Sequence, residues 1–151
     1  TLPVENTQVA VIAPPEMDGM PFAEETKELF RCVSEHDFDA LADLCDDDFG
    51  IIDLGTEGQS VVVETREAWE NWFHTLFARL DEMNAHTSTE INKYQALQNG
   101  DMGYGVVDFC QLLTFNEQTA RFYCVTTIIW KRVNDVWKES RWHCSLIRVE
   151  Q

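Results

Sequence analysis

The sequence of 151 residues has few basic side chains and no long apolar run. Lys and Arg number 11 against 27 Asp and Glu, which gives a formal net charge of −16. Nucleic acids and anionic membranes are bound largely through Lys and Arg, so this balance argues against both as partners. We find no stretch long enough to cross a bilayer and no basic and apolar opening typical of a signal peptide.

The pattern of the cysteines excludes two kinds of cross-link. The number of cysteines, 5, is odd, and no C-x-x-C spacing occurs, so neither a disulfide framework nor a zinc ribbon is predicted. Each cysteine lies among apolar residues, where a free thiol behaves as a small hydrophobe. We therefore expect a reduced, cytoplasmic protein without a bound metal or cofactor. The cysteines are Cys32, Cys45, Cys110, Cys124 and Cys144.

Proline is confined to the start of the chain. All 4 prolines lie within residues 1–21, which predicts an N-terminal arm in which 9–13 could pair as an edge strand. Residues 22–151 are then of a size typical of one domain. The aromatic content of 11% is enough to fill a substantial core.

Apolar periodicity predicts helices over 22–35, 38–46 and 66–80, with Asp37 and Thr65 as N-caps of the second and third. Short strands are expected at 50–54 and 60–63. Four long strands follow, at 86–98, 102–115, 121–133 and 136–149, separated by residues typical of hairpin turns. Helices gathered on one face of an antiparallel sheet make an α+β domain.

The turn residues also predict which strand positions face each other. A two-residue turn at Asn134 and Asp135 places Val133 opposite Val136, and then Thr127 opposite Trp142. A longer turn after Phe115 places Asp108 opposite Thr127. One predicted face holds Tyr104, Val106, Asp108, Cys110, Leu112, Tyr123, Val125, Thr127, Ile129, Ser140, Trp142 and Cys144. The other holds Val107, Phe109, Gln111, Leu113, Cys124, Thr126, Ile128, Trp130, Arg141, His143 and Ser145.

Both predicted faces are apolar, whereas a sheet with one face in water alternates more cleanly. The helices can cover the first face, which would enclose a pocket. We predict that the second face is covered by another copy of the chain in a homodimer.

Three strings carry a resemblance to a known family: residues 37–44 (DFDALADL), 69–73 (WENWF) and 137–145 (WKESRWHCS). With the order of elements, they resemble the nuclear transport factor 2-like superfamily, and within it the SnoaL-like, ketosteroid-isomerase-like and scytalone-dehydratase-like groups. The resemblance covers about 22–149. It implies a cone-shaped α+β barrel in which helices and the concave sheet enclose one pocket, and dimers that form through the convex face.

The resemblance also implies roles for single residues. In ketosteroid isomerases the general base is an Asp on the short strand after the second helix, where this chain has Asp53. The two oxyanion-hole positions hold Leu29 and Thr127 instead of Tyr and Asp. In scytalone dehydratase a catalytic His opens the first long strand, where this chain has His86. The other positions of that site hold Gln111, Ser34, Val33, Leu54 and Thr127.

The candidate catalytic residues are Asp53, His86 and Asp108. A lone carboxylate among branched apolar residues has a raised pKa when buried, which suits Asp53 as a general base, although it could instead cap the following turn. His86 could move protons near neutral pH, or simply bond to backbone at the rim. Asp108 lies inside an apolar strand and needs a partner if buried, either in a pocket or in a structural pair. The expected ligand-lining residues are Tyr104, Tyr123, Thr127, Trp142 and Trp72.

Two functions fit these observations. The first is a small-molecule pocket protein, in its catalytic form a cofactor-free isomerase, dehydratase or cyclase that acts by acid–base chemistry on a neutral apolar ligand. The alternative is a non-catalytic module of the same fold that dimerises or holds a ligand. A pocket that contains Asp53 and Asp108 together would favour the first, and an interior filled by Trp142 and Phe side chains would favour the second.

Overall fold

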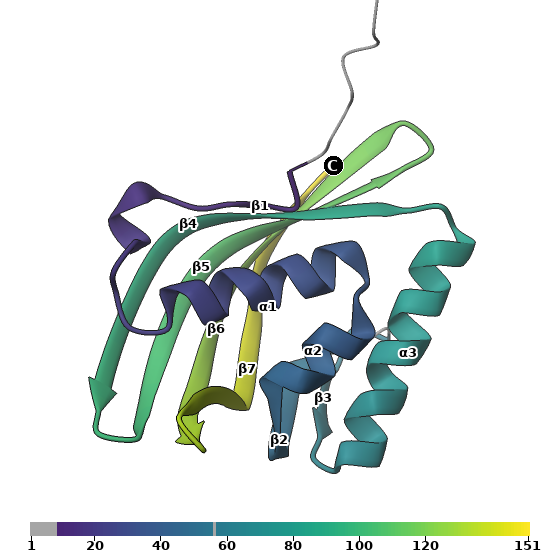
Figure 1. Ribbon diagram of the computed structural model, residues 1–151. Helices are drawn as coiled ribbons and strands as arrows, with labels where there is room; N and C mark the ends of the chain where they lie inside the picture. The colour runs from purple at the N-terminus through teal and green to yellow at the C-terminus, as the bar shows by residue number, and fades with distance from the viewer. Residues whose placement is uncertain (1–8, 56) are drawn as a thin grey trace, which may run out of the picture.

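Three helices lie on one side of a curved sheet in the computed structural model, which describes residues 9–55 and 57–151 (Figure 1). The helices are α1 (Ala23–Glu35), α2 (Phe38–Leu44) and α3 (Arg66–Glu82), and a short 3-10 turn, η1 (Pro15–Met17), precedes them. The α+β class and the layering of helices on a curved sheet are confirmed. None of the helices in the described residues could span a membrane.

The sheet has seven strands in the order β1-β4-β5-β6-β7-β2-β3. Its centre is the predicted antiparallel meander, and the sheet remains open between β1 and β3. At the edges, β1 runs parallel to β4 and β2 runs parallel to β7, so the sheet is mixed. The strands are β1 (Val11–Ile12), β2 (Cys45–Leu54), β3 (Ser60–Val63), β4 (His86–Asn99), β5 (Met102–Phe115), β6 (Gln118–Val133) and β7 (Val136–Glu150).

Both predicted helix caps are confirmed. The Asp37 carboxylate accepts a hydrogen bond from the Ala40 N–H at 3.3 Å, and the Thr65 hydroxyl accepts one from Ala68 at 3.1 Å. The second helix is shorter than predicted, because Cys45 is already extended and pairs with Glu139 of β7. The strand predicted at 50–54 therefore begins at Cys45.

The segment expected to form an arm contains ordered elements. Residues 1–8 lie outside the described part, but β1 pairs with β4 within the range proposed as an edge strand. Met17 of η1 is 1% exposed and belongs to the hydrophobic core. This end of the chain thus closes one side of the core.

The core lies between the helices and one face of the sheet, which we call the concave face. On β5 and β6 this face carries Val107, Phe109, Ile128 and Trp130, all of them buried. The ring of Phe30 on α1 packs on Phe109 with centroids 4.7 Å apart. Since side chains alternate along a strand, the neighbouring residues of β5 and β6 point to the opposite, convex face.

On β5 and β6, the predicted assignment of side chains to the two faces of the sheet was inverted. The helices cover the set that begins with Val107 and Phe109, not the set that begins with Tyr104 and Asp108. Both sets are rich in apolar residues, so the alternation could not show which one the helices cover. The turn after Phe115 is also tighter than expected, because Phe115 pairs with Gln118. Asp108 is therefore opposite Val125, and Thr127 is opposite Val106.

On β7 the predicted pairing with β6 was wrong for a different reason, although Trp142 and Cys144 do face the helices as predicted. Val133 does pair with Val136, as predicted, but the register shifts where Ile129 pairs with Arg141 and Trp130 with Glu139. Ser140 is the extra residue of this bulge, and one extra residue moves every later side chain to the other face. Thr127 is consequently opposite His143, and Trp142 lies opposite Ile128 on the concave face.

Glu139 is a fully buried carboxyl group beside the bulge. The Cys45 thiol donates to its Oε1 at 3.7 Å, and among the described residues its Oε2 has no hydrogen-bond partner. Burial raises the pKa of Glu139 to about 8. The folded protein therefore keeps this group protonated at neutral pH, where the unfolded chain releases the proton.

We predict that Glu139→Gln stabilises the protein at neutral pH. The carboxyl pKa is about 8 in the folded protein against an ordinary value of 4.5, so folding stability falls as pH rises between these values. The isosteric amide removes this loss, and at pH 7 the gain is about 3 kcal/mol, while below pH 4.5 the two proteins converge. Urea unfolding at several pH values measures the difference. Glu64→Gln, at an exposed site, is the matched control, and an equal pH dependence in wild type and Glu139→Gln would contradict the prediction.

Candidate functional site

Asp53 lies on β2 and points to the concave face, two residues after the core residue Ile51. The indole N–H of Trp142 donates to its Oδ2 at 2.9 Å. The backbone N–H of Leu54 donates to its Oδ1 at 2.7 Å. Both carboxylate oxygens are thus held by N–H groups of the same chain, which fixes the orientation of the carboxylate. The side chain remains half-buried, so solvent reaches one side of it.

Burial is the strongest influence on the acidity of Asp53. It raises the pKa of the carboxyl above its ordinary value, and the hydrogen bonds from Trp142 and Leu54 offset part of that rise. A carboxylate of raised basicity in a partly apolar site is what a general base requires. The thiol of Cys144 is also next to Asp53, and a hydrogen bond with Cys124 together with burial raises its pKa, so Cys144 stays neutral.

Aromatic rings fill the concave face beside this carboxylate. Trp142 packs on Phe30 with centroids 5.8 Å apart and on Phe109 with centroids 6.0 Å apart. With the Phe30–Phe109 contact, these rings form a closed triangle between α1 and the sheet. Trp142 itself stays half-buried, so this wall ends at a partly accessible edge next to Asp53.

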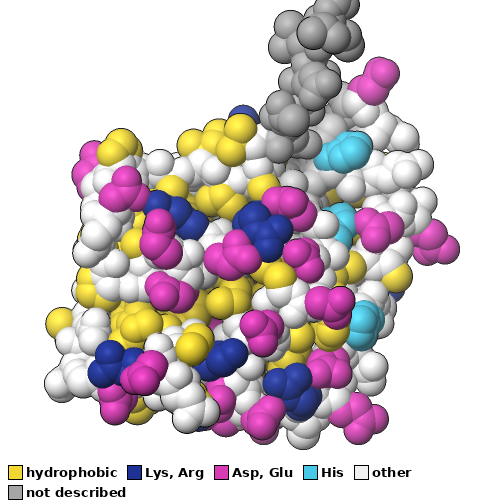
Figure 2. All heavy atoms as spheres, in the orientation of Figure 1, with side chains coloured by type: hydrophobic (Ala, Val, Ile, Leu, Met, Phe, Trp, Pro, Cys, Tyr) yellow, Lys and Arg dark blue, Asp and Glu magenta, His cyan; other side chains and the backbone are white. Residues whose placement is uncertain are grey.

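His86 lies in a different place, at the start of β4. It lines a polar cleft of about 370 Å³ together with side chains from the ends of α1 and α3. Figure 2 shows histidine side chains along the α3 side of the molecule. In this cleft, the His36 ring bonds to Asp81 at 2.6 Å and to the Thr87 hydroxyl at 3.1 Å. Both ring nitrogens of His36 are therefore occupied, and the exposed His86 is the other imidazole of the cleft.

Asp108 lies on the convex face, where Lys93 and Val125 are its cross-strand neighbours. The structure therefore does not bring Asp53, His86 and Asp108 together. The predicted ligand-lining residues are likewise split between the two faces of the sheet. Trp142 lies on the concave face, and Trp72 packs from α3 against the same core. Three others lie on the convex strand positions: Tyr104, Tyr123 and Thr127.

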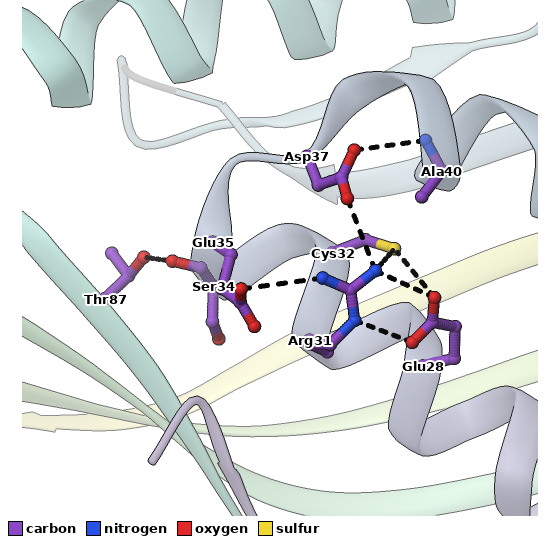
Figure 3. A network of polar contacts seen from close by, with 8 residues as sticks. All are labelled: Glu28, Arg31, Cys32, Ser34, Glu35, Asp37, Ala40 and Thr87. Atoms are coloured by element: carbon purple, nitrogen blue, oxygen red, sulfur yellow. Dashed lines mark hydrogen bonds and ion pairs between the residues drawn. The ribbon is translucent and has the colours of Figure 1, made fainter. Parts of the chain in front are cut away.

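Other charged clusters of the described residues are paired within the chain. Arg31 on α1 donates two hydrogen bonds to Glu28, at 2.7 and 2.8 Å, and one to Asp37 at 3.3 Å (Figure 3). Because Asp37 also caps α2, this network joins the two helices. It forms part of the wall of a shallow groove of about 650 Å³ between α1 and β1.

The acidic run at the start of β2 is neutralised in a similar way. Lys131 bonds to Asp46 at 2.6 Å and to Asp48 at 3.0 Å, and Arg66 bonds to Asp47 at 2.9 Å. No group of three or more His, Cys, Asp or Glu side chains in the described ranges is arranged to hold a metal ion.

Comparison with known families gives the fold a name. Residues 25–149 match the model of the SnoaL-like domain. The chain belongs to the SnoaL-like family. A search of curated proteins returned no match. The position of Asp53, on the strand that follows α2, therefore lies within the family domain.

Solved structures of this fold carry several different descriptions. A provisionally assigned dehydratase of the NTF2-like family from Streptomyces avermitilis is 15% identical, with a TM-score of 0.73 over 89% of this chain and 99% of the other. The hexachlorocyclohexane dehydrochlorinase LinA-type3 from Novosphingobium barchaimii is 16% identical, with a TM-score of 0.65 over 83% of each chain.

A third solved structure carries a non-enzymatic description. It is a provisionally assigned calcium/calmodulin-dependent protein kinase II association domain from Thiobacillus denitrificans, 17% identical, with a TM-score of 0.65 over 91% of this chain and 98% of the other. At such identities these likenesses establish the SnoaL-like fold alone, because one fold hosts many activities.

We predict that Trp142→Phe raises the pKa of Asp53 further. Phenylalanine keeps the aromatic packing but removes the N–H that stabilises the ionised carboxylate. Carbon NMR titration of the aspartate carboxyl groups measures the rise. Trp72→Phe, which alters a tryptophan on α3, serves as the matched control. An unchanged or lower Asp53 pKa in Trp142→Phe would show that this hydrogen bond does not set the acidity.

Proposed function

We propose that the protein binds a small, neutral, largely apolar molecule at the concave face and that Asp53 removes a proton from it. The observation that carries the proposal is the Asp53 carboxylate itself, which two N–H groups orient beside an aromatic wall. Its raised pKa gives it the basicity of a general base, and its half-buried position leaves it within reach of a ligand.

The character of the ligand follows from the surroundings of Asp53. The half-buried ring of Trp142 offers apolar contact, and the net charge of −16 repels anions at long range. Abstraction of a proton next to a carbonyl group is the simplest reaction for one positioned carboxylate. Isomerisation, dehydration and cyclisation can each begin with that step.

We predict that the protein catalyses exchange of α-protons in neutral aromatic ketones and that Asp53→Asn abolishes it. In deuterated water, loss of the α-proton signal reports proton abstraction without knowledge of the natural product. Asn cannot accept the proton, so the rate should fall by about 100-fold or more. The wild-type rate should rise with pH as Asp53 ionises, with a midpoint above the ordinary Asp value.

Asp108→Asn is the matched control for this experiment, because it removes a carboxylate from the convex face. Its exchange rate should equal that of the wild type. Full exchange activity in Asp53→Asn, or equal losses in the two variants, would refute the role of Asp53 as the base.

A second candidate function is association of two copies through the convex face. The triangle of Phe30, Phe109 and Trp142 fills much of the interior, which favours a packing role for the domain. The convex face presents apolar side chains that are half-buried or exposed, among them Tyr104 at 40%. Exposure of such an apolar face to water is energetically unfavourable unless a partner covers it.

Charge also favours a second copy as that partner. The convex face carries both signs: Lys93, Arg121, Arg141 and Arg148 against Glu90, Asp108 and Glu150. This near-neutral surface differs from the helix side, where Figure 2 shows acidic side chains widely spread. Two copies that meet at their convex faces avoid most of the repulsion between like charges.

We predict that the wild type is a dimer at micromolar concentration and that Val125→Glu is a folded monomer. Val125 is half-buried near the centre of the convex face, opposite Asp108 and Ser145, so a new carboxylate there would be desolvated in a dimer. Light scattering gives the mass, and circular dichroism checks the fold. Met83→Glu, at the C-cap of α3 on the helix side and 37% exposed, is the control and should remain dimeric. A monomeric wild type would rule out the association.

A further inference from the structure

The bulge of β7 lies where the pairing of β7 with β2 is also irregular. Between two paired positions, β7 has Ser140 alone, whereas β2 has the four residues 46–49. Extra residues in a strand are left unpaired and locally disrupt the ladder of backbone hydrogen bonds. Backbone pairing is therefore interrupted at Ser140 on both sides of β7. The direction of the residues that follow, Trp142 among them, then depends on side-chain contacts as well.

The Ser140 side chain is held by a group of charged residues. Its hydroxyl donates to the Asp48 carboxylate of β2, 3.2 Å from Oδ1 and 3.1 Å from Oδ2. Asp48 in turn pairs with Lys131 at 3.0 Å, and Lys131 also pairs with Asp46 at 2.6 Å. Ser140 is 7% exposed, so water competes little for its hydroxyl. We call Ser140, Asp48, Lys131 and Asp46 the bulge cluster.

The bulge cluster joins three strands from the side of the sheet that faces away from the helices. Strand β7 lies between β6 and β2, so the Lys131 side chain of β6 crosses β7 to reach its two partners on β2. Lys131 follows the core residue Trp130 and therefore points to the convex face. Asp53 and Trp142 lie on the concave face. The cluster is thus separate from the face at which a ligand is proposed to bind.

The contact between Trp142 and Asp53 is sensitive to the backbone at Ser140. Only one residue separates Ser140 from Trp142 along β7. The indole N–H lies at the far end of the Trp142 side chain, 2.9 Å from Asp53 Oδ2. A small rotation of the backbone at the bulge therefore moves this N–H by a larger distance. Hydrogen bonds weaken steeply when their length and angle depart from the optimum, so the contact would be lost.

We propose that the hydrogen bond from Ser140 to Asp48 holds Trp142 in the place from which it orients the Asp53 carboxylate, which makes Ser140 a positioning residue for the base. This inference rests on the proposed role of Asp53 as a general base. Without the Ser140 hydroxyl, Asp53 loses its indole donor, and its pKa rises in the same direction as in Trp142→Phe.

Two variants remove the hydrogen bond from opposite ends, Ser140→Ala and Asp48→Ala. In the full-length protein without ligand, carbon NMR should show a higher titration midpoint for the Asp53 carboxyl in both. The Trp142 indole N–H should exchange with solvent about fivefold faster or more, as expected for one lost hydrogen bond. Removal of the Asp48 charge alone would lower the Asp53 midpoint, so a rise in Asp48→Ala reports the lost contact.

A control and a double variant separate positioning from general destabilisation. Thr26→Ala removes a fully buried hydroxyl group from α1 and should leave the Asp53 midpoint at its wild-type value. Because Ser140 acts through Trp142, adding Ser140→Ala to Trp142→Phe should not move the midpoint beyond that of Trp142→Phe alone. A merely structural role would lower the urea midpoint of unfolding and leave the Asp53 titration unchanged.

The outcomes distinguish this inference from the proposed function. Unchanged Asp53 midpoints in Ser140→Ala and Asp48→Ala refute the inference, as does a further rise when Ser140→Ala is added to Trp142→Phe. If Ser140→Ala does not fold, Asp48→Ala decides, because that side chain is 53% exposed.

The exchange of α-protons in acetophenone supplies the second readout. Its rate should fall about tenfold in Ser140→Ala, because a misplaced base reacts more slowly. If the wild type catalyses no exchange, the proposed function is refuted, and the NMR midpoints still show whether Ser140 positions Trp142. Exchange at the wild-type rate in a Ser140→Ala protein whose Asp53 midpoint has risen would refute the positioning of the base while Asp53 itself remains the candidate.

Discussion

The bulge at Ser140 decides which residues of β7 reach the interior. Side chains alternate between the two faces of a strand, so one inserted residue exchanges the faces of everything that follows. Because of this insertion, Trp142 pairs with Ile128 on the side of the helices. Its indole then reaches Asp53, and its ring completes the contact with Phe30 and Phe109. A regular strand would place Trp142 on the convex face and leave the Asp53 carboxylate without its side-chain donor.

Much of the fold could be predicted because the signals are local. Asp37 and Thr65 cap helices by accepting hydrogen bonds from residues three positions later, and Asn134 and Asp135 have the positive φ angles of a tight hairpin turn. The edge strands at 60–63 and within 9–13 were predicted, but the strands with which the outer part of the sheet pairs could not be predicted in this way. The parallel pairing of β2 with β7 joins residues about ninety positions apart, and nothing in the local pattern around Cys45 marks it as the start of a strand.

The candidate site could likewise be predicted from the sequence only in part. The apolar neighbours of Asp53 indicated a carboxylate with a raised pKa, and the family resemblance pointed to the same position. The contact with Trp142 depends on the bulge, so spacing alone could not reveal it. Gln111 and Asp108 are three residues apart on one strand and therefore lie on opposite faces. The sequence pattern favoured Asp108 because an acid inside an apolar strand is conspicuous, but with apolar residues on both faces the pattern could not show that Asp108 faces away from the helices.

The uneven distribution of charge has a consequence for the size of any assembly. Most of the excess of acidic over basic residues lies away from the near-neutral convex face. In the proposed dimer through that face, both helix layers would point outward and carry the bulk of the negative charge. A third copy would then approach a surface of its own sign on every accessible side. Electrostatic repulsion would stop growth at two subunits and keep the particles apart in concentrated solution.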